Sequence, residues 1–118
     1  MAHRVLVIED NGALRFALRV MLEFEPYIEK VELVPSGEAA LRVVLELDPH
    51  VVVTDHGLPG MSGEELAGMI RDRCPHARIV SFSGSDETAP WADESITKGN
   101  ATAIEDLRAA VSRGGRAA

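Results

Sequence analysis

Residues that can bind phosphate follow the apolar, β-branched runs of this chain at four points. Glu9 and Asp10 end the first run, Asp55 the second, Ser83 the third, and Lys98 a fourth, weaker run. Such runs, separated by helical patterns, are typical of buried strands in a parallel sheet. Ligands of these sheets lie beyond the carboxyl ends of the strands. We therefore expect three carboxylates, one hydroxyl and one ammonium at a single edge, which favours metal-assisted acceptance of a phosphoryl group.

The acidic residues predict a site for a divalent cation. If the strands before Asp10 and Asp55 are neighbours, these carboxylates converge with that of Glu9, and a cation relieves their repulsion. Mg²⁺ suits such a site because it prefers oxygen ligands and keeps several waters. A single acidic residue after a strand is more typical of a turn or a helix cap. The combination with Ser83 and Lys98 is what favours a site.

Asp55 is the best candidate for covalent chemistry, because a carboxylate can attack phosphorus and form an acyl phosphate. Lys98 would pair with one phosphoryl oxygen, and the hydroxyl of Ser83 would donate to another. The backbone N–H groups of His56 and Gly84 could add further donors. Phosphoryl transfer depends mainly on placement and charge. We expect a phosphoacceptor with at most self-phosphorylation and autodephosphorylation activity, not a multiple-turnover enzyme.

The elements that position these residues alternate between strand and helix. We expect strands at about 4–9, 29–34, 50–54 and 77–82, a short strand before Lys98, and helices at about 11–24, 36–47, 62–73 and 102–114. Alternating strands and helices imply right-handed crossovers and a three-layer α/β sandwich. With 118 residues the chain is expected to form a single domain over residues 1–118.

Helix caps and apolar faces refine this expectation. Ser36, Ser62 and Thr102 are predicted N-caps, the last two with a glutamate three residues later, as in a capping box. Leu45 and Ile104 belong to the apolar stripes that are expected to face the sheet.

Composition limits the class of partner. The 19 acidic and 12 basic residues leave a net charge of −7, which disfavours direct binding of nucleic acid or an anionic membrane. The single cysteine, Cys74, excludes an internal disulfide and fits a reducing compartment. No apolar run reaches membrane-spanning length, and no secretory segment precedes the first strand. We expect a cytoplasmic protein.

At these residues the chain resembles the response-regulator receiver (CheY-like) family of two-component signalling. The resemblance covers essentially the whole length and depends on Glu9–Asp10, Ser83, Lys98 and Asp55 within the stretch 55–63. It implies a doubly wound, flavodoxin-like parallel sheet of five strands in the order 2-1-3-4-5. It also implies that a histidine kinase or phosphotransfer protein phosphorylates the chain, which then signals to a downstream protein.

The resemblance also implies roles for single residues. Asp55 would accept the phosphoryl group. Asp10, Asp55 and the backbone carbonyl of Gly57 would bind Mg²⁺ directly, and Glu9 would act through water.

Three departures from the family pattern bear on signalling. Gly99 replaces the proline that usually follows the lysine, and Ser95 replaces the usual aromatic residue three positions before it. Few positions separate Ser83 from Lys98, so the fourth helix is expected to be reduced or absent. We therefore predict that phosphorylation orders residues 84–94, because Ser95 provides no aromatic ring to rotate.

Alternative interpretations remain open at this point. The departures at Ser95 and Gly99 favour an interaction module of the same fold that signals without phosphate. A phosphatase-like enzyme would need an acid two positions after Asp55, where the chain has Gly57. A flavin-binding protein of this fold is disfavoured, because acidic strand ends repel its phosphate. Trp91 is expected either to anchor a polar loop or to contact a partner.

Overall fold

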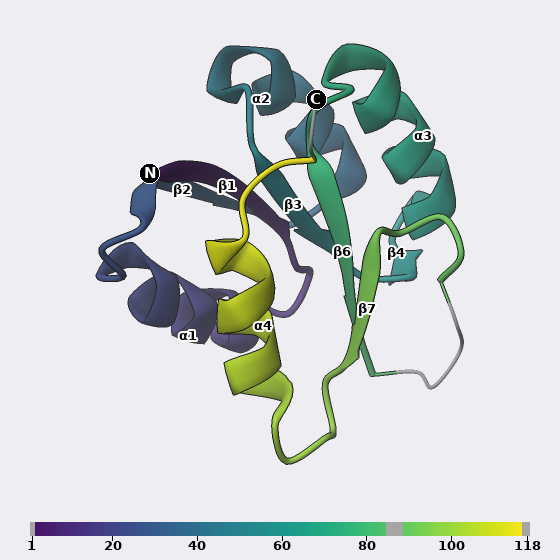
Figure 1. The fold of residues 1–118 in the computed structure, drawn as a ribbon. Helices are drawn as coiled ribbons and strands as arrows, with labels where there is room; N and C mark the ends of the chain where they lie inside the picture. The colour runs from purple at the N-terminus through teal and green to yellow at the C-terminus, as the bar shows by residue number, and fades with distance from the viewer. Residues whose placement is uncertain (1, 85–88, 117–118) are drawn as a thin grey trace.

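The computed structural model describes residues 2–84 and 89–116. The strands are β1 (His3–Ile8), β2 (Ile28–Val34), β3 (Val51–Thr54), β4 (Gly57–Leu58), β5 (Met61–Ser62), β6 (Arg78–Ser83) and β7 (Glu94–Thr97). The helices are α1 (Gly12–Glu23), α2 (Gly37–Leu47), α3 (Gly63–Arg73) and α4 (Ala103–Ser112). Five strands form a parallel sheet in the order β2-β1-β3-β6-β7 (Figure 1). The predicted doubly wound topology is confirmed.

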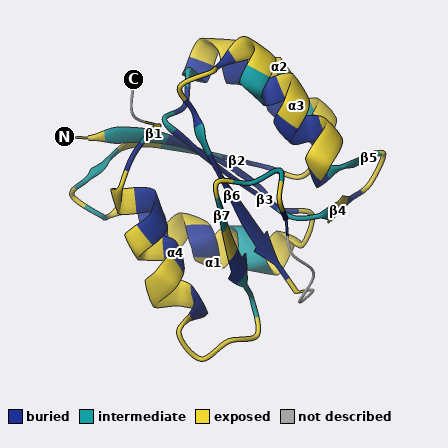
Figure 2. Ribbon diagram, turned by 45° about the vertical axis from the view of Figure 1, so that its right-hand side comes forward, coloured by how far each residue is buried: buried dark blue, intermediate teal, exposed yellow. Residues whose placement is uncertain are grey.

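The sheet lies between two layers of helices. Helices α1 and α4 cover one face, α2 and α3 cover the other, and their buried sides turn toward the sheet (Figure 2). Successive strand residues point to opposite faces, so Val5 and Val7 belong to the core under α1 and α4, whereas Leu6 and Ile8 belong to the core under α2 and α3. Burial on both faces explains why β1 and β3 read as continuous apolar runs.

Two of the predicted helix caps are confirmed. The hydroxyl of Ser36 accepts the N–H of Ala39 at 3.2 Å, and the hydroxyl of Ser62 accepts the N–H of Glu65 at 3.1 Å. Both serines have extended backbone, which lets the side chain satisfy an N–H that has no partner within the helix. These caps fix where α2 and α3 begin.

Three predictions about the helices were wrong. Thr102 makes no side-chain cap: its backbone is not extended, and its hydroxyl donates instead to Asp106 Oδ2 at 2.9 Å. Leu45 and Ile104 are 66% and 43% exposed. Each lies one residue past a buried position, about 100° around the helix axis. The stripes that face the sheet are therefore narrower than the apolar content suggested.

The connection between β6 and β7 has no helix among its described residues, 84 and 89–93, in line with the expected reduction of the fourth helix. Asp93 ties this segment to the start of β6, because its N–H donates to the Ile79 carbonyl and its carboxylate accepts the Ile79 N–H, both at 2.8 Å. The predicted ordering of residues 84–94 falls partly on 85–88, which lie outside the described residues.

The topology brings the predicted functional residues to one edge of the sheet. Strands β1, β3 and β7 end one residue before Glu9, Asp55 and Lys98, and β6 ends at Ser83 itself. Neighbouring parallel strands in register deliver these four positions to the same end of the sheet. In the described part of the chain, no helix is long and apolar enough to cross a membrane.

Candidate functional site

Lys98 lies between two carboxylates at the carboxyl edge of the sheet. Its Nζ is 2.7 Å from Glu9 Oε1 and 3.1 Å from Asp55 Oδ2. The side chain of Glu9 is only 3% exposed, that of Asp55 18% and that of Lys98 21%. The site is thus a partly buried ammonium shared by a buried and a more accessible carboxylate.

Asp55 receives further hydrogen bonds from the backbone that directly follows it. The N–H of His56 donates to Asp55 Oδ1 at 2.6 Å, and that of Gly57 lies 3.5 Å from the same oxygen. Burial alone would raise the pKa of Asp55, but hydrogen bonds from Lys98 and Ser83, the Lys98 charge and the His56 N–H together hold this pKa below its ordinary value. Asp55 is therefore an ionised carboxylate at neutral pH, as a nucleophile must be.

The pKa of Lys98 shifts in the opposite direction. Burial would lower this pKa, but hydrogen bonds to Glu9 and Asp55 and the charges of both carboxylates raise it above its ordinary value. The side chain is therefore a fixed positive charge beside Asp55, where it can stabilise negative charge on a group bound to that carboxylate.

Glu9 is held from the start of α1. The N–H of Asn11 donates to Glu9 Oε2 at 3.1 Å, and the guanidinium of Arg15 donates to the Glu9 carbonyl at 2.9 Å. Both oxygens of this buried carboxylate thus have donors, one from α1 and one from Lys98. The first turn of α1 is therefore part of the frame of the site.

The structure brings together Glu9, Asp55, Ser83 and Lys98, and it places His56 N–H on Asp55 as expected. Asp10 is the second residue after β1 and Gly84 the first after β6, and both are exposed. Their roles, and that of the Gly57 carbonyl, stay predictions.

The chemical type of the donor atoms at this edge suits a hard divalent cation, because the donors are carboxylate oxygens. Glu9 and Asp55 already converge on one cation, the Lys98 ammonium. Within residues 2–84 and 89–116, no three His, Cys, Asp or Glu side chains are arranged to hold a metal ion. The magnesium ligand set therefore stays a prediction.

Gly63 connects the loop after Asp55 to the segment before β7. Its N–H donates to the His56 carbonyl at 2.8 Å. A Cβ at this position would overlap the backbone oxygen of Asp55 and would lie 2.9 Å from Cη2 of Trp91. The glycine that ends the 55–63 stretch is thus explained by the close approach of two neighbours.

Trp91 was expected either to anchor a loop or to contact a partner. Its packing in the structure fits a loop anchor, and its closeness to the site was missed. The ring packs against the core under α2 and α3 and meets the His56 ring edge-on, with centroids 5.3 Å apart. No periodic pattern in the sequence joins these two positions. The signal that could have indicated this contact was the presence of a large aromatic ring in an otherwise polar segment.

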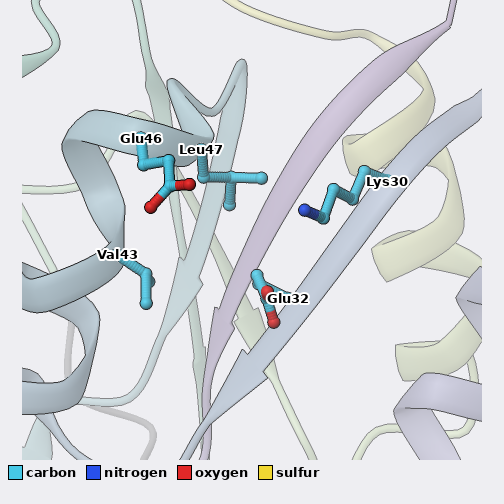
Figure 3. Close-up of a pocket in the computed structure, with 5 residues that line it drawn as sticks. All are labelled: Lys30, Glu32, Val43, Glu46 and Leu47. Atoms are coloured by element: carbon cyan, nitrogen blue, oxygen red, sulfur yellow. The ribbon is translucent and has the colours of Figure 1, made fainter.

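A small hollow lies at another edge of the sheet, between β2 and α2 (Figure 3). It measures about 110 Å³ and is lined by Lys30, Glu32, Val43, Glu46 and Leu47. Ligand pockets usually enclose about 300–1,000 Å³, so this hollow is too small for an organic ligand. The carboxyl edge around Asp55 remains the candidate site.

The fold and the site define a doubly wound α/β domain with a charged cluster at the carboxyl edge of its sheet. Comparison with known proteins identifies its family. A family model described as the response regulator receiver domain matches residues 5–105. The chain belongs to this family, as the sequence analysis predicted.

Individual relatives agree with this assignment. The response regulator protein FleR of Pseudomonas aeruginosa is 40% identical over 80 residues, which are 68% of this chain and 16% of FleR. The transcriptional regulatory protein KdpE of Mycobacterium tuberculosis is 36% identical over 122 residues, covering 97% of this chain and 53% of KdpE. The chain thus spans at most about half of these relatives.

A solved structure shows the same fold. The response regulator protein TrrA of Thermotoga maritima, in complex with Mg²⁺ and BeF, matches with a TM-score of 0.79 at 29% identity, covering 96% of this chain and 98% of TrrA.

Proposed function

We propose that this receiver domain accepts a phosphoryl group on Asp55 from a histidine kinase or phosphotransfer protein and signals the change to a protein partner. The observation that supports this most directly is the setting of Asp55. Its carboxylate is ionised and partly accessible, and donors from Lys98, Ser83 and His56 surround it.

The transfer balances with a phosphohistidine as donor. One Asp55 oxygen attacks phosphorus, and the new P–O bond forms as the P–N bond to the donor imidazole breaks. The bonding pair stays on the imidazole nitrogen, which then takes a proton. Lys98 and the His56 N–H, already directed at this carboxylate, stabilise the charge on the phosphoryl oxygens.

A magnesium ion is part of this proposal. Glu9, Asp10, Asp55 and the Gly57 carbonyl are the groups that would hold it, and the all-oxygen set supports that assignment. When bound, the ion would neutralise charge on the transferred group. Lys98 would then exchange a carboxylate partner for a phosphoryl oxygen.

The outward face of α1 supports docking of a phosphodonor protein. Phe16, Val20 and Phe24 are 69%, 49% and 81% exposed, and their spacing of four residues places them in one line along the helix. We call this line the α1 stripe. Arg15 and Arg19 lie beside it. A partner helix with an apolar face and acidic borders fits this surface, which adjoins the site.

The proposal also implies a place in the cell. A phosphohistidine donor of this kind acts in the cytoplasm, and Cys74 is buried as a free thiol, which is the usual state of cysteine in reducing compartments.

Mass spectrometry of the intact protein tests phosphorylation directly. The chain is incubated with Mg²⁺ and acetyl phosphate, and we expect the gain of one phosphoryl group that decays slowly. Asp55→Asn should abolish the gain, because the amide cannot attack phosphorus. Asp72→Asn, which changes an exposed aspartate near the C-terminal end of α3, is the matched control and should be phosphorylated like the wild type.

Two other results would each indicate a different function for the protein. Continuous release of phosphate without accumulation would indicate a phosphatase. A complete lack of mass gain, with this donor and with a histidine kinase, would indicate the phosphate-independent module.

A further inference from the structure

We propose that Trp91 is the aromatic residue through which the state of Asp55 reaches residues 89–93 before β7, in place of a ring at position 95. In this role Trp91 is a positioning residue for the loop after Asp55. The inference rests on the proposed phosphorylation of Asp55.

The first support is the direct contact between Trp91 and the residue after Asp55. The rings of His56 and Trp91 are 5.3 Å apart at an interplanar angle of 70°, which is a favourable edge-to-face geometry. The backbone N–H of the same His56 donates to Asp55 Oδ1 at 2.6 Å. One residue therefore touches both the acceptor carboxylate and the Trp91 ring.

The second support is that hydrogen bonds hold the backbone of Trp91 and of the residues that follow it. The guanidinium of Arg71 donates to the Trp91 carbonyl and also pairs with Asp93 at 3.1 Å. Asp93 in turn is bound to the Ile79 backbone. The backbone that carries the ring is thus attached to α3 and β6, and a shift of His56 changes the contact.

The third support is the shape of the space around the ring. Gly63 faces both the Asp55 carbonyl and the Trp91 ring, with no side chain between them. By contrast, Ser95 is exposed on the short edge strand β7. Trp91 is therefore an aromatic group in contact with the loop after Asp55, whereas Phe82 lies against Lys98, with its ring centroid 5.6 Å from Nζ.

The contact belongs to the unmodified state. In the structure the His56 N–H is directed at a carboxylate oxygen. A phosphoryl group on Asp55 requires the same N–H to turn toward a phosphoryl oxygen, which moves the His56 peptide and its ring. The contact between His56 and Trp91 then weakens. A substitution that removes this contact should therefore favour the modified state.

Fluorescence and calorimetry together test this inference. Trp91 is the only tryptophan in the chain, so the tryptophan emission reports the surroundings of this ring alone. The full chain is titrated with beryllium fluoride and Mg²⁺, a phosphoryl analogue, and binding is measured by its heat independently of the emission. We expect binding to change the Trp91 emission and to increase its quenching by acrylamide.

Variants at position 56 separate the contact from general stability. His56→Ala should bind the analogue about two- to tenfold more tightly, the range expected from loss of one aromatic pair, and should lose the emission change. His56→Phe keeps a ring and should retain the emission change. His76→Ala, at the opposite end of the sheet, should behave like the wild type. Circular dichroism checks that each variant is folded.

The outcomes are distinct. If the analogue binds but the emission stays constant, or if His56→Ala keeps the full emission change, the inference is overturned and the proposed function stands. If no heat of binding is found, the proposed function fails and the inference fails with it.

Discussion

Glu9 is almost fully buried and depends on Lys98 for its counter-charge. The two atoms of this pair, Lys98 Nζ and Glu9 Oε1, are 2.7 Å apart, and the Asn11 N–H satisfies the second carboxylate oxygen. A buried charge that loses its partner is strongly destabilising. Lys98 therefore stabilises the folded state in addition to its proposed part in phosphoryl transfer.

Lys98→Met should lower the free energy of unfolding by about 2 kcal/mol at pH 7, which is less than the cost of breaking a fully buried pair because Lys98 is partly exposed. Urea denaturation measures this difference. Lys30→Met, at an exposed position on β2, is the control and should change stability by less than about 0.5 kcal/mol. Equal stability of both variants and the wild type would contradict the role given to Lys98.

The penalty of Lys98→Met should depend on pH. The folded pKa of Asp55 lies below its ordinary value of 3.8, so the stability from its ionised form is present above that value and is lost as the pH falls through the folded pKa. The folded pKa of Lys98 lies above its ordinary 10.5, so its contribution is present below that value and is lost as the pH rises through the folded pKa. We expect a constant penalty between about pH 5 and 9 that shrinks at both extremes.

Helix α3 begins at a glycine that touches the acceptor loop. Ser62 caps the helix and Gly63 is its first residue, packed against the Asp55 carbonyl and the Trp91 ring. The short hairpin of β4 and β5 returns the chain from Asp55 to this point, with Gly60 at a positive φ of 85° in its turn. The position of the helix is therefore fixed relative to the acceptor carboxylate.

Gly63→Ala should lower the free energy of unfolding by about 2 kcal/mol or more, because a side chain here forces the packed neighbours apart. Gly68→Ala in the same helix is the matched control, since a Cβ there meets nothing within 4 Å. It should stabilise the protein by about 0.5–1 kcal/mol, as alanine does in a helix interior. Thermal and urea unfolding distinguish the two, and similar effects at both positions would refute the packing argument.

The elements that hold the site could be predicted because a change from apolar to polar residues marks where each strand ends. The β-branched runs stop at Glu9, Asp55 and Lys98, and the alternation of strands with helices then places these residues at one edge. The sharing of Lys98 by two carboxylates was not predicted, since the sequence suggested a metal ion between the acidic groups. Side-chain partners of this kind depend on distances that no spacing in the chain encodes.

Contacts between distant segments were harder to predict. Trp91 and His56 meet only because the segment before β7 folds back along α3, held there by Arg71. Thr102 matched a capping box in sequence, yet its backbone turns so that the hydroxyl reaches Asp106. The first difference arises from tertiary packing between distant segments and the second from local backbone geometry, and residue type alone determines neither.

The molecule as a whole carries a net charge of −7, but the surface beside the site is different. The α1 stripe is apolar, and the two arginines beside it form a basic border on an otherwise acidic domain. Electrostatic complementarity speeds association and selects partners more than it adds affinity. A phosphodonor with acidic side chains around an apolar helix would therefore be guided to the correct end of the domain.

Phe16→Ser in the α1 stripe should slow phosphorylation by a histidine kinase that phosphorylates the wild type, by about tenfold or more, as expected for a large aromatic anchor. Phosphorylation by acetyl phosphate should be unchanged, because that donor needs no docking surface. Leu45→Ser, an equally exposed change on the opposite layer, should leave both rates unaltered. Parallel loss with both donors would place the effect in the chemistry instead of in docking.

The ammonium between Glu9 and Asp55 has a consequence for the biogenesis of the domain. The repulsion between two acidic groups is reduced by a positively charged side chain of the same polypeptide. We therefore expect a newly synthesised chain to complete its sheet edge without an ion from the surrounding medium.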